Sequence, residues 1–205
     1  MEKVNRTVQL YAQVITFLVI WAVAIVVSGI FNPVDLWAAV KLVPSAISVY
    51  AVIALVFTQW IWRWGIFQGW LIKIPDLQGT WRGELKSDWI NPATQQRIAP
   101  IPVVLVIRQT FSTINCTLMT AESTSYSTAA AINLAPDDKD LYLTYNYTNR
   151  PKAIVRDRSE IHDGAAILKI IKRPARMLEG EYWTSRKTRG DITLTFESNS
   201  LVERF

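Results

Sequence analysis

The stretch PDLQGTWRGEL, residues 75–85, divides the chain into two parts that follow different patterns. On its N-terminal side, long apolar runs carry almost no charge, and on its C-terminal side, short segments alternate between apolar and polar residues. The stretch itself follows the second pattern, since Trp81, Gly83 and Leu85 alternate with charged residues. This period of two predicts a strand that begins near Gly79.

The first part, residues 1–74, contains two uncharged stretches, one from Thr7 to Val34 and the other from Leu42 to Trp62. A transmembrane helix needs about 20 apolar residues, and both stretches are long enough. Neither has the period of a helix with a single apolar face, which disfavours buried core helices. A cleaved signal peptide is another alternative, but a second span follows the first. We therefore predict a two-helix transmembrane hairpin and a short interfacial connector that ends at residue 74.

Basic residues around the spans predict which side of the membrane the chain ends occupy. Lys3 and Arg6 precede the first span, Arg63 and Lys73 follow the second, and the loop between the spans contains only Lys41. Because positively charged flanks stay in the cytoplasm, both termini are predicted to be cytoplasmic. Residues 75–205 would then lie inside the cell.

The second part, residues 75–205, is predicted to form a separate all-β domain. Most of its strands are joined by short turns, and no helix of ten or more residues is indicated. We predict an eight-stranded antiparallel up-and-down β-barrel, because closure leaves no exposed strand edge; a two-sheet sandwich is the alternative. The fold class is thus a membrane-anchored all-β protein. The predicted strands span residues 79–90, 102–111, 113–121, 124–132, 140–147, 163–171, 176–186 and 190–198.

The distribution of charge argues against a DNA or RNA polymer as partner. The net charge of the chain is +5, but residues 75–205, with 17 basic and 15 acidic side chains, carry only +2 of it. This balance fits a surface of mixed charges better than a basic patch. The single cysteine, Cys116, excludes an intramolecular disulfide, and the single histidine, His162, does not make a zinc site by itself.

The sequence contains none of the common catalytic motifs. GxSxG, HExxH, CxxC and a phosphate-binding glycine-rich loop are all missing. We therefore predict a binding protein and not an enzyme, without a metal or a cofactor.

Residues suited to binding are concentrated on the fifth and seventh predicted strands and in the turn after the seventh. Tyrosines offer aromatic faces that stack on bases, arginines pair with phosphates, and Asn and Thr offer neutral donors and acceptors. An eight-stranded barrel is wide enough to hold one small ligand. The predicted ligand-binding residues are Tyr145, Asn149, Arg150, Tyr182, Thr184, Arg186 and Thr188.

Four segments carry a resemblance to a known family: PDLQGTWRGEL at 75–85, YNYTNRPK at 145–152, HDGAAIL at 162–168 and LEGEYWTSRKTRGDI at 178–192. With the preceding hairpin, they resemble the two-transmembrane, β-strand-rich effectors of bacterial cyclic-oligonucleotide-based antiphage signalling systems (CBASS). The resemblance spans the whole chain. The combination of the hairpin, Gly-Thr-Trp at the boundary and G-x-Y-W-T-x-R-x-T-x-G near the end is more specific than any one of them.

The resemblance implies an antiphage defence effector. In that family the cytosolic barrel is a receptor for a cyclic dinucleotide that a partner nucleotidyltransferase makes. Ligand binding drives assembly of the membrane segments and loss of inner-membrane integrity, which kills the infected cell. For this chain the resemblance implies a location in the bacterial inner membrane, with the lipid bilayer and further copies of the chain as partners.

Two alternatives to this function remain open. One is a membrane-anchored lipocalin-like carrier of a small apolar ligand, because Gly-x-Trp also opens lipocalin barrels. The other is a structural membrane adaptor whose barrel is filled by side chains.

Overall fold

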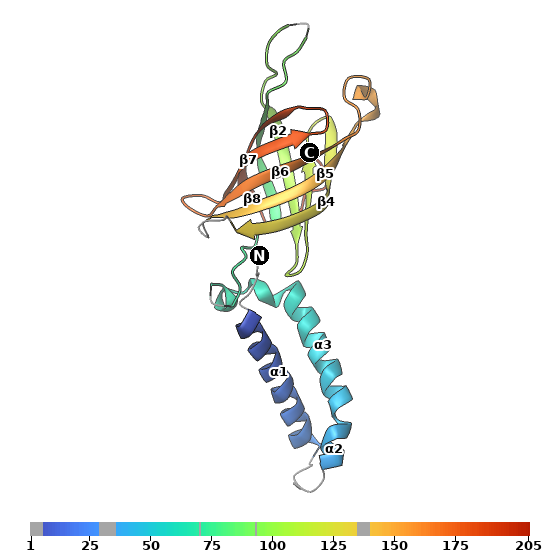
Figure 1. Ribbon diagram of the computed structural model, residues 1–205, viewed down its shortest axis with the longest axis vertical. Helices are drawn as coiled ribbons and strands as arrows, with labels where there is room; N and C mark the ends of the chain where they lie inside the picture. The colour runs from blue at the N-terminus through green and yellow to red at the C-terminus, as the bar shows by residue number, and fades with distance from the viewer. Residues whose placement is uncertain (1–5, 29–35, 70, 93, 135–139) are drawn as a thin grey trace. The chain divides into compact units, whose positions relative to one another are not determined.

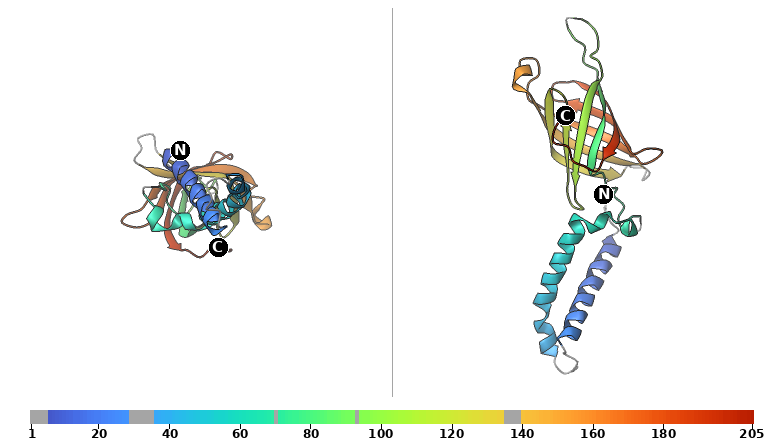
Figure 2. Two further views of the ribbon diagram at one scale, coloured as in Figure 1. Left: turned by 90° about the horizontal axis from the view of Figure 1, so that it is seen from below. Right: turned by 180° about the vertical axis from the view of Figure 1, so that it is seen from behind.

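A computed structural model of the chain describes residues 6–28, 36–69, 71–92, 94–134 and 140–205. The chain divides into two compact units, a helical unit over Glu2–Pro75 and a β unit over Asp76–Phe205 (Figures 1 and 2).

The helical unit is built from two long apolar helices. Helix α1 spans Arg6–Val27, the short helix α2 spans Leu36–Lys41, and α3 spans Val43–Gln59. Two single 3₁₀ turns follow, η1 at Ile61–Arg63 and η2 at Gly65–Phe67. Helices α1 and α3 lie side by side (Figure 1).

The helices contain two stretches that are long and apolar enough to cross a membrane, Leu10–Val27 and Trp37–Gln59. The indole Nε1 of Trp21 donates a hydrogen bond to the carbonyl oxygen of Ala39 over 3.0 Å, which ties α1 to α2. The predicted pair of apolar helices is therefore present. Lys3, on which part of the topology prediction rests, lies outside the described residues.

The β unit is a closed antiparallel barrel in which each strand pairs with the next in sequence and β1 pairs with β8. This arrangement confirms the predicted up-and-down topology and replaces the alternative of a two-sheet sandwich. Its strands are β1 (Gly79–Ser87), β2 (Ile101–Gln109), β3 (Ile114–Met119), β4 (Ser123–Leu134), β5 (Leu141–Pro151), β6 (His162–Ile171), β7 (Met177–Thr184) and β8 (Arg189–Ser198).

Strand β5 is longer than predicted. It continues four residues past the predicted end at residue 147, because Asn149 pairs with His162 of β6 and Pro151 pairs with Ser123 of β4. Strand β1 is shorter than predicted and ends at Ser87, where the chain enters the connection to β2.

The seam that closes the barrel depends on a glycine. Gly83 of β1 lies opposite Leu194 of β8. A Cβ atom at Gly83 would lie 1.9 Å from the carbonyl oxygen of Thr193. A side chain at this position would therefore force β1 and β8 apart.

One end of the barrel is filled by packed side chains. Trp81 is buried, and its Nε1 donates to the carbonyl oxygen of Leu77 over 2.9 Å. The Trp81 and Phe196 rings meet edge to face with centroids 5.2 Å apart, and the Arg176 guanidinium lies 3.7 Å from the Phe196 ring centroid. The centre of the barrel is packed with fully buried leucines, namely Leu105, Leu143, Leu168, Leu178 and Leu194.

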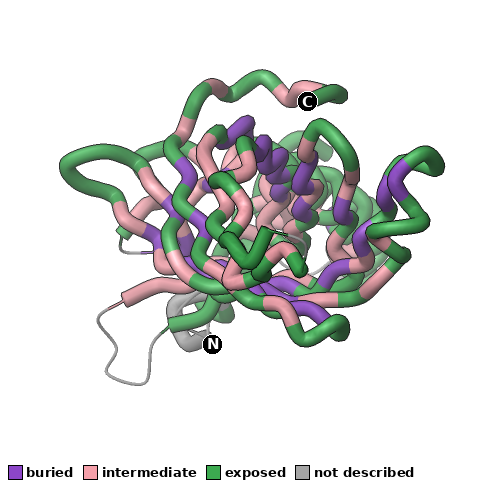
Figure 3. Tube along the Cα trace, turned by 90° about the horizontal axis from the view of Figure 1, so that it is seen from above, coloured by how far each residue is buried: buried purple, intermediate pink, exposed green. Residues whose placement is uncertain are grey.

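The C-terminal segment covers part of the barrel's outer surface. Val104 and Val106 of β2 face outward yet are buried, because Leu201 and Val202 pack against them. The Thr80 hydroxyl holds this segment by donating to the carbonyl oxygen of Ser200 over 2.6 Å. Strand β2 is consequently buried on both faces over residues 103–107. Figure 3 shows that buried stretches lie mainly along the barrel strands and that the loops around them are largely exposed.

Candidate ligand-binding site

The end of the barrel opposite Trp81 contains a cavity of about 670 Å³. It lies where β1, β3, β5 and β7 end and where β2, β4, β6 and β8 begin, and the β1–β2 and β5–β6 connections contribute to its lining. Cavities that bind small molecules measure about 300–1,000 Å³, so this one is large enough for a compact ligand.

Three tyrosines form the aromatic wall of the cavity. Tyr145 and Tyr147 of β5 and Tyr182 of β7 are all buried, and the first two rings have centroids 5.9 Å apart. Burial raises the pKa of all three phenols. Each tyrosine therefore stays protonated at neutral pH and offers an uncharged hydroxyl beside an aromatic face.

A buried polar pair lies between β4 and β5. Ser125 and Asn149 are direct cross-strand partners, and both line the cavity. The Ser125 hydroxyl donates to Oδ1 of Asn149 over 2.9 Å. The pair adds hydrogen-bonding groups to a lining that also contains aliphatic side chains such as Leu85, Ile101 and Ile192.

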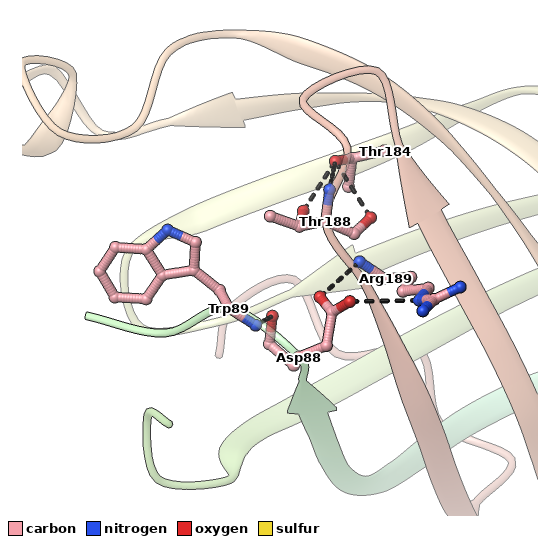
Figure 4. Close-up of polar contacts among 6 residues, drawn as sticks. Asp88, Trp89, Thr184, Thr188 and Arg189 are labelled. Atoms are coloured by element: carbon pink, nitrogen blue, oxygen red, sulfur yellow. Dashed lines mark hydrogen bonds and ion pairs between the residues drawn. The ribbon is translucent and has the colours of Figure 1, made fainter. Parts of the chain in front are cut away.

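The turn between β7 and β8 is held by its two threonines (Figure 4). The hydroxyls of Thr184 and Thr188 are 2.7 Å apart, and the Thr184 N–H donates to the Thr188 carbonyl oxygen over 2.9 Å. Lys187 has a φ of 65°, a left-handed conformation that tight turns use. The turn presents Arg186 at the opening of the cavity.

Asp88 ties this turn to the end of β1 (Figure 4). Its carboxylate accepts from the Arg189 backbone N–H over 2.9 Å and from the Arg189 Nε over 3.2 Å. The backbone hydrogen bond from Arg189 lowers the pKa of Asp88. Trp89 follows directly; it is 41% exposed and lines the cavity at its rim.

Two arginines supply positive charge at the opening. Arg186 donates from Nη1 to the Ser159 hydroxyl over 3.3 Å, and Arg158 lies 2.6 Å from the Glu122 carboxylate. All four residues line the cavity, and both arginines are exposed.

His162 lies beside these cations at the start of β6. Its Nδ1 is 2.8 Å from the carbonyl oxygen of Glu160. Burial lowers the pKa of His162, the contact with the Glu160 carbonyl opposes this effect, and the charge of Arg186 lowers the pKa further. The imidazole is therefore neutral at neutral pH.

The structure brings six of the seven predicted site residues together around the cavity. These are Tyr145, Asn149, Tyr182, Thr184, Arg186 and Thr188. Arg150 is not among the lining residues, and its side chain is exposed. Since side chains alternate along a strand and Asn149 faces inward, Arg150 lies on the outer face of β5.

Sequence reasoning missed several residues that line the cavity. Arg158 and Glu122 lie in connections between strands, where no period assigns a direction. No motif or charge pattern in the sequence indicates that Ser125 or Trp89 binds a ligand. Tyr147 could have been included, because it shares a face of β5 with Tyr145.

No cluster of three or more metal-ligating side chains is found within the described part of the chain. Beside aliphatic side chains, the groups that line the cavity are aromatic rings, hydroxyls, one amide, one imidazole, one carboxylate and two guanidinium ions. This set suits a compact anionic ligand that carries flat rings.

Comparison with known proteins identifies the family. The family model described as "Cap15, cyclic dinucleotide receptor domain" matches residues 72–195, more than half of the chain. The chain belongs to the Cap15 family. A curated Cap15 relative, "CD-NTase-associated protein 15" from Staphylococcus schleiferi, is 26% identical over 155 residues, which cover 76% of this chain and 79% of the relative.

Membership of the Cap15 family confirms the resemblance drawn from the sequence. The chain is a CBASS effector whose barrel is a cyclic dinucleotide receptor domain. The family match covers the lining residues named above. They include Tyr145, Tyr147, Asn149, Arg158, His162, Tyr182, Thr184, Arg186 and Thr188.

Proposed function

We propose that the cavity binds a cyclic dinucleotide made by a partner nucleotidyltransferase, that binding causes several copies of the chain to assemble, and that the assembly disrupts the bacterial inner membrane and kills the infected cell. The observation that carries this proposal is the composition of the cavity. Three buried tyrosines line its wall while Arg158 and Arg186 stand at its opening. The proposal assigns a binding role to the chain and no catalytic one.

The arrangement matches the two kinds of group in a cyclic dinucleotide. Its phosphates would pair with Arg186 and Arg158, because a guanidinium fits two phosphate oxygens at once. Its bases would enter between the tyrosines, where stacking contributes about 1–3 kcal/mol for each base. Asn149, Thr184 and Thr188 would hydrogen-bond to the polar edges of the ligand.

The helical unit supports the step from binding to membrane disruption. A single pair of helices cannot enclose a pore, so several copies are needed. Small residues such as Ala22, Ser48 and Ala51 are exposed on α1 and α3, and small residues permit close packing between helices in a bilayer. A ligand favours the assembled state only by binding it more tightly than the single chain.

The test uses the full chain in lipid vesicles that contain a self-quenching dye. We expect a cyclic dinucleotide to release the dye, and a linear dinucleotide with the same bases to release none. Calorimetry on the full chain in detergent measures binding separately. Binding of the cyclic dinucleotide without dye release would overturn the membrane step alone.

The same experiment separates the receptor from an apolar carrier. Fatty acids are tested beside the cyclic dinucleotides. Binding of fatty acids with no binding of any cyclic dinucleotide would contradict the receptor proposal and favour the lipocalin-like carrier.

A further inference from the structure

The buried pair of Ser125 and Asn149 supports an inference that rests on the proposed function and makes it more specific. Ser125 is 6% exposed and Asn149 is 7% exposed. Ser125 donates to Oδ1 of Asn149 over 2.9 Å. The hydrogen bond uses one of the two lone pairs of the Asn149 amide oxygen and fixes which end of the amide faces β4.

The other end of the amide is the Nδ2 group, which carries two N–H donors. Within the described residues, the structure shows no protein acceptor for either of these N–H groups. The amide nitrogen is not among the described side-chain atoms that are fully buried without a partner, so it is accessible from the cavity that Asn149 lines. A ligand that supplies an acceptor can therefore bond to these N–H groups in place of water.

The surroundings of Asn149 indicate which part of the ligand supplies the acceptor. Tyr147 precedes Asn149 by two residues and lies on the same face of β5. Arg158 and Arg186, in contrast, are exposed at the opening. Phosphates would stay beside the arginines, and a base would stack deeper beside the tyrosines. The acceptor that meets Asn149 therefore belongs to a base.

We infer that Ser125 is a positioning residue that holds the Asn149 amide with its N–H groups toward the ligand. In this orientation the site selects a cyclic dinucleotide in which at least one base presents a carbonyl oxygen. Guanine offers two neighbouring acceptors, O6 and N7, and uracil offers a carbonyl oxygen in its ring. Adenine has an amino donor where guanine has O6 and keeps only N7 as an acceptor on that edge. It can therefore accept from the amide at one position where guanine can accept at two, and its amino group must share Oδ1 with Ser125.

The test measures dissociation constants by calorimetry on the full chain in detergent, with cyclic di-GMP, cyclic di-UMP and cyclic di-AMP as probes. We expect cyclic di-GMP or cyclic di-UMP to bind more tightly than cyclic di-AMP. Asn149→Asp keeps the shape but removes both donors, so it should abolish this preference. Ser125→Ala should weaken binding of the preferred ligand by about threefold to tenfold. It should also reduce the ratio between the dissociation constants of cyclic di-AMP and the preferred ligand.

A double-mutant cycle distinguishes positioning from a general structural role. Ser125→Ala should change affinity less than about twofold when Asn149 is already Ala, because Ser125 acts through that amide. Thr124→Ala is the matched control, since Thr124 is the neighbouring residue on β4 and pairs with Arg150, away from the cavity. Thr124→Ala should leave the dissociation constants of all three cyclic dinucleotides unchanged.

The outcomes separate this inference from the proposed function. If the parent chain binds none of the probes, the proposed function and this inference are both overturned. If the parent binds cyclic di-AMP at least as tightly as the other two, or if Ser125→Ala has the same effect with and without Asn149, only this inference is overturned.

Discussion

Arg186 is the residue whose position links the fold most directly to ligand charge. The Thr184–Thr188 turn holds its backbone, and its guanidinium reaches Ser159 across the opening of the cavity. Arg150 carries the same charge on the outer face of β5. The two arginines therefore differ in placement and not in chemistry, which makes them a matched pair for mutation.

The first prediction compares Arg186→Ala with Arg150→Ala. A charge-assisted hydrogen bond contributes about 1.5–3 kcal/mol, so Arg186→Ala should weaken binding of the cyclic dinucleotide by about tenfold to a hundredfold. Arg150→Ala should bind like the parent. Calorimetry gives both dissociation constants. Equal losses in the two variants would mean that overall charge, and not contact in the cavity, determines affinity.

The second prediction concerns His162 and pH. Burial and Arg186 keep the pKa of free His162 below its usual value, whereas a bound phosphate would raise it. The complex then takes up a proton more readily than the free protein, so affinity should increase as pH falls. Between about pH 8 and pH 6 the increase should be about threefold to tenfold.

The control for this effect is His162→Gln, which keeps a neutral polar side chain of similar size. The affinity of this variant for the cyclic dinucleotide should change less with pH than that of the parent. An identical pH profile in both proteins would show that a different group titrates.

Strand β8 contains a core residue, Leu194, that should affect the stability of the barrel without affecting ligand binding. Leu194 is fully buried in the barrel centre, and Thr193 beside it is exposed on the outer face. Leu194→Ala should lower the free energy of unfolding by about 2–5 kcal/mol, because it leaves a cavity in the core. Thr193→Ala should change it by about 0.5 kcal/mol or less.

Denaturant unfolding of the full chain checks this third prediction, with loss of β-sheet signal as the readout. At temperatures where both variants are folded, their ligand affinities should match the parent. A large loss of affinity in Leu194→Ala would mean that the cavity extends to the barrel centre.

The elements could be predicted from the sequence to different degrees. The period of two located all eight strands, and short turns indicated the up-and-down order. The burial of Val104 and Val106 on the outer face could not be predicted, because the segment that covers them is 95 or more residues away and has no strand pattern. Such coverage depends on tertiary packing.

Alternation along the strands explains only part of the predicted site. Tyr145 and Tyr147 share a face, so continuing the alternation places Asn149 inside and Arg150 outside; the prediction ended this strand at residue 147 and lost that information. The pairing of Ser125 with Asn149 depends on register, and an irregularity between Ser127 and Ala129 shifts that register. A single sequence does not reveal such a shift.

A receptor for a ligand made inside the cell requires the barrel to lie in the cytoplasm. The fourth prediction is therefore that a reporter fused after Phe205 is active only in the cytoplasm. The physical reason is the excess of basic residues flanking the spans over the single Lys41 between them. A matched fusion placed after Lys41 should give the opposite result. Activity of the Phe205 fusion in the periplasm would contradict the receptor account.

Hydrogen–deuterium exchange on the full chain in lipid nanodiscs, with and without a cyclic dinucleotide, tests most directly whether this cavity is the receptor site. With ligand bound, we expect slower exchange in the segments around the cavity, at residues 88–92, 152–161 and 185–188. We expect no change in the turns at the filled end, at residues 110–113 and 172–176. Protection confined to the filled end, or no protection around the cavity at saturating ligand, would contradict the assignment of this cavity as the receptor site.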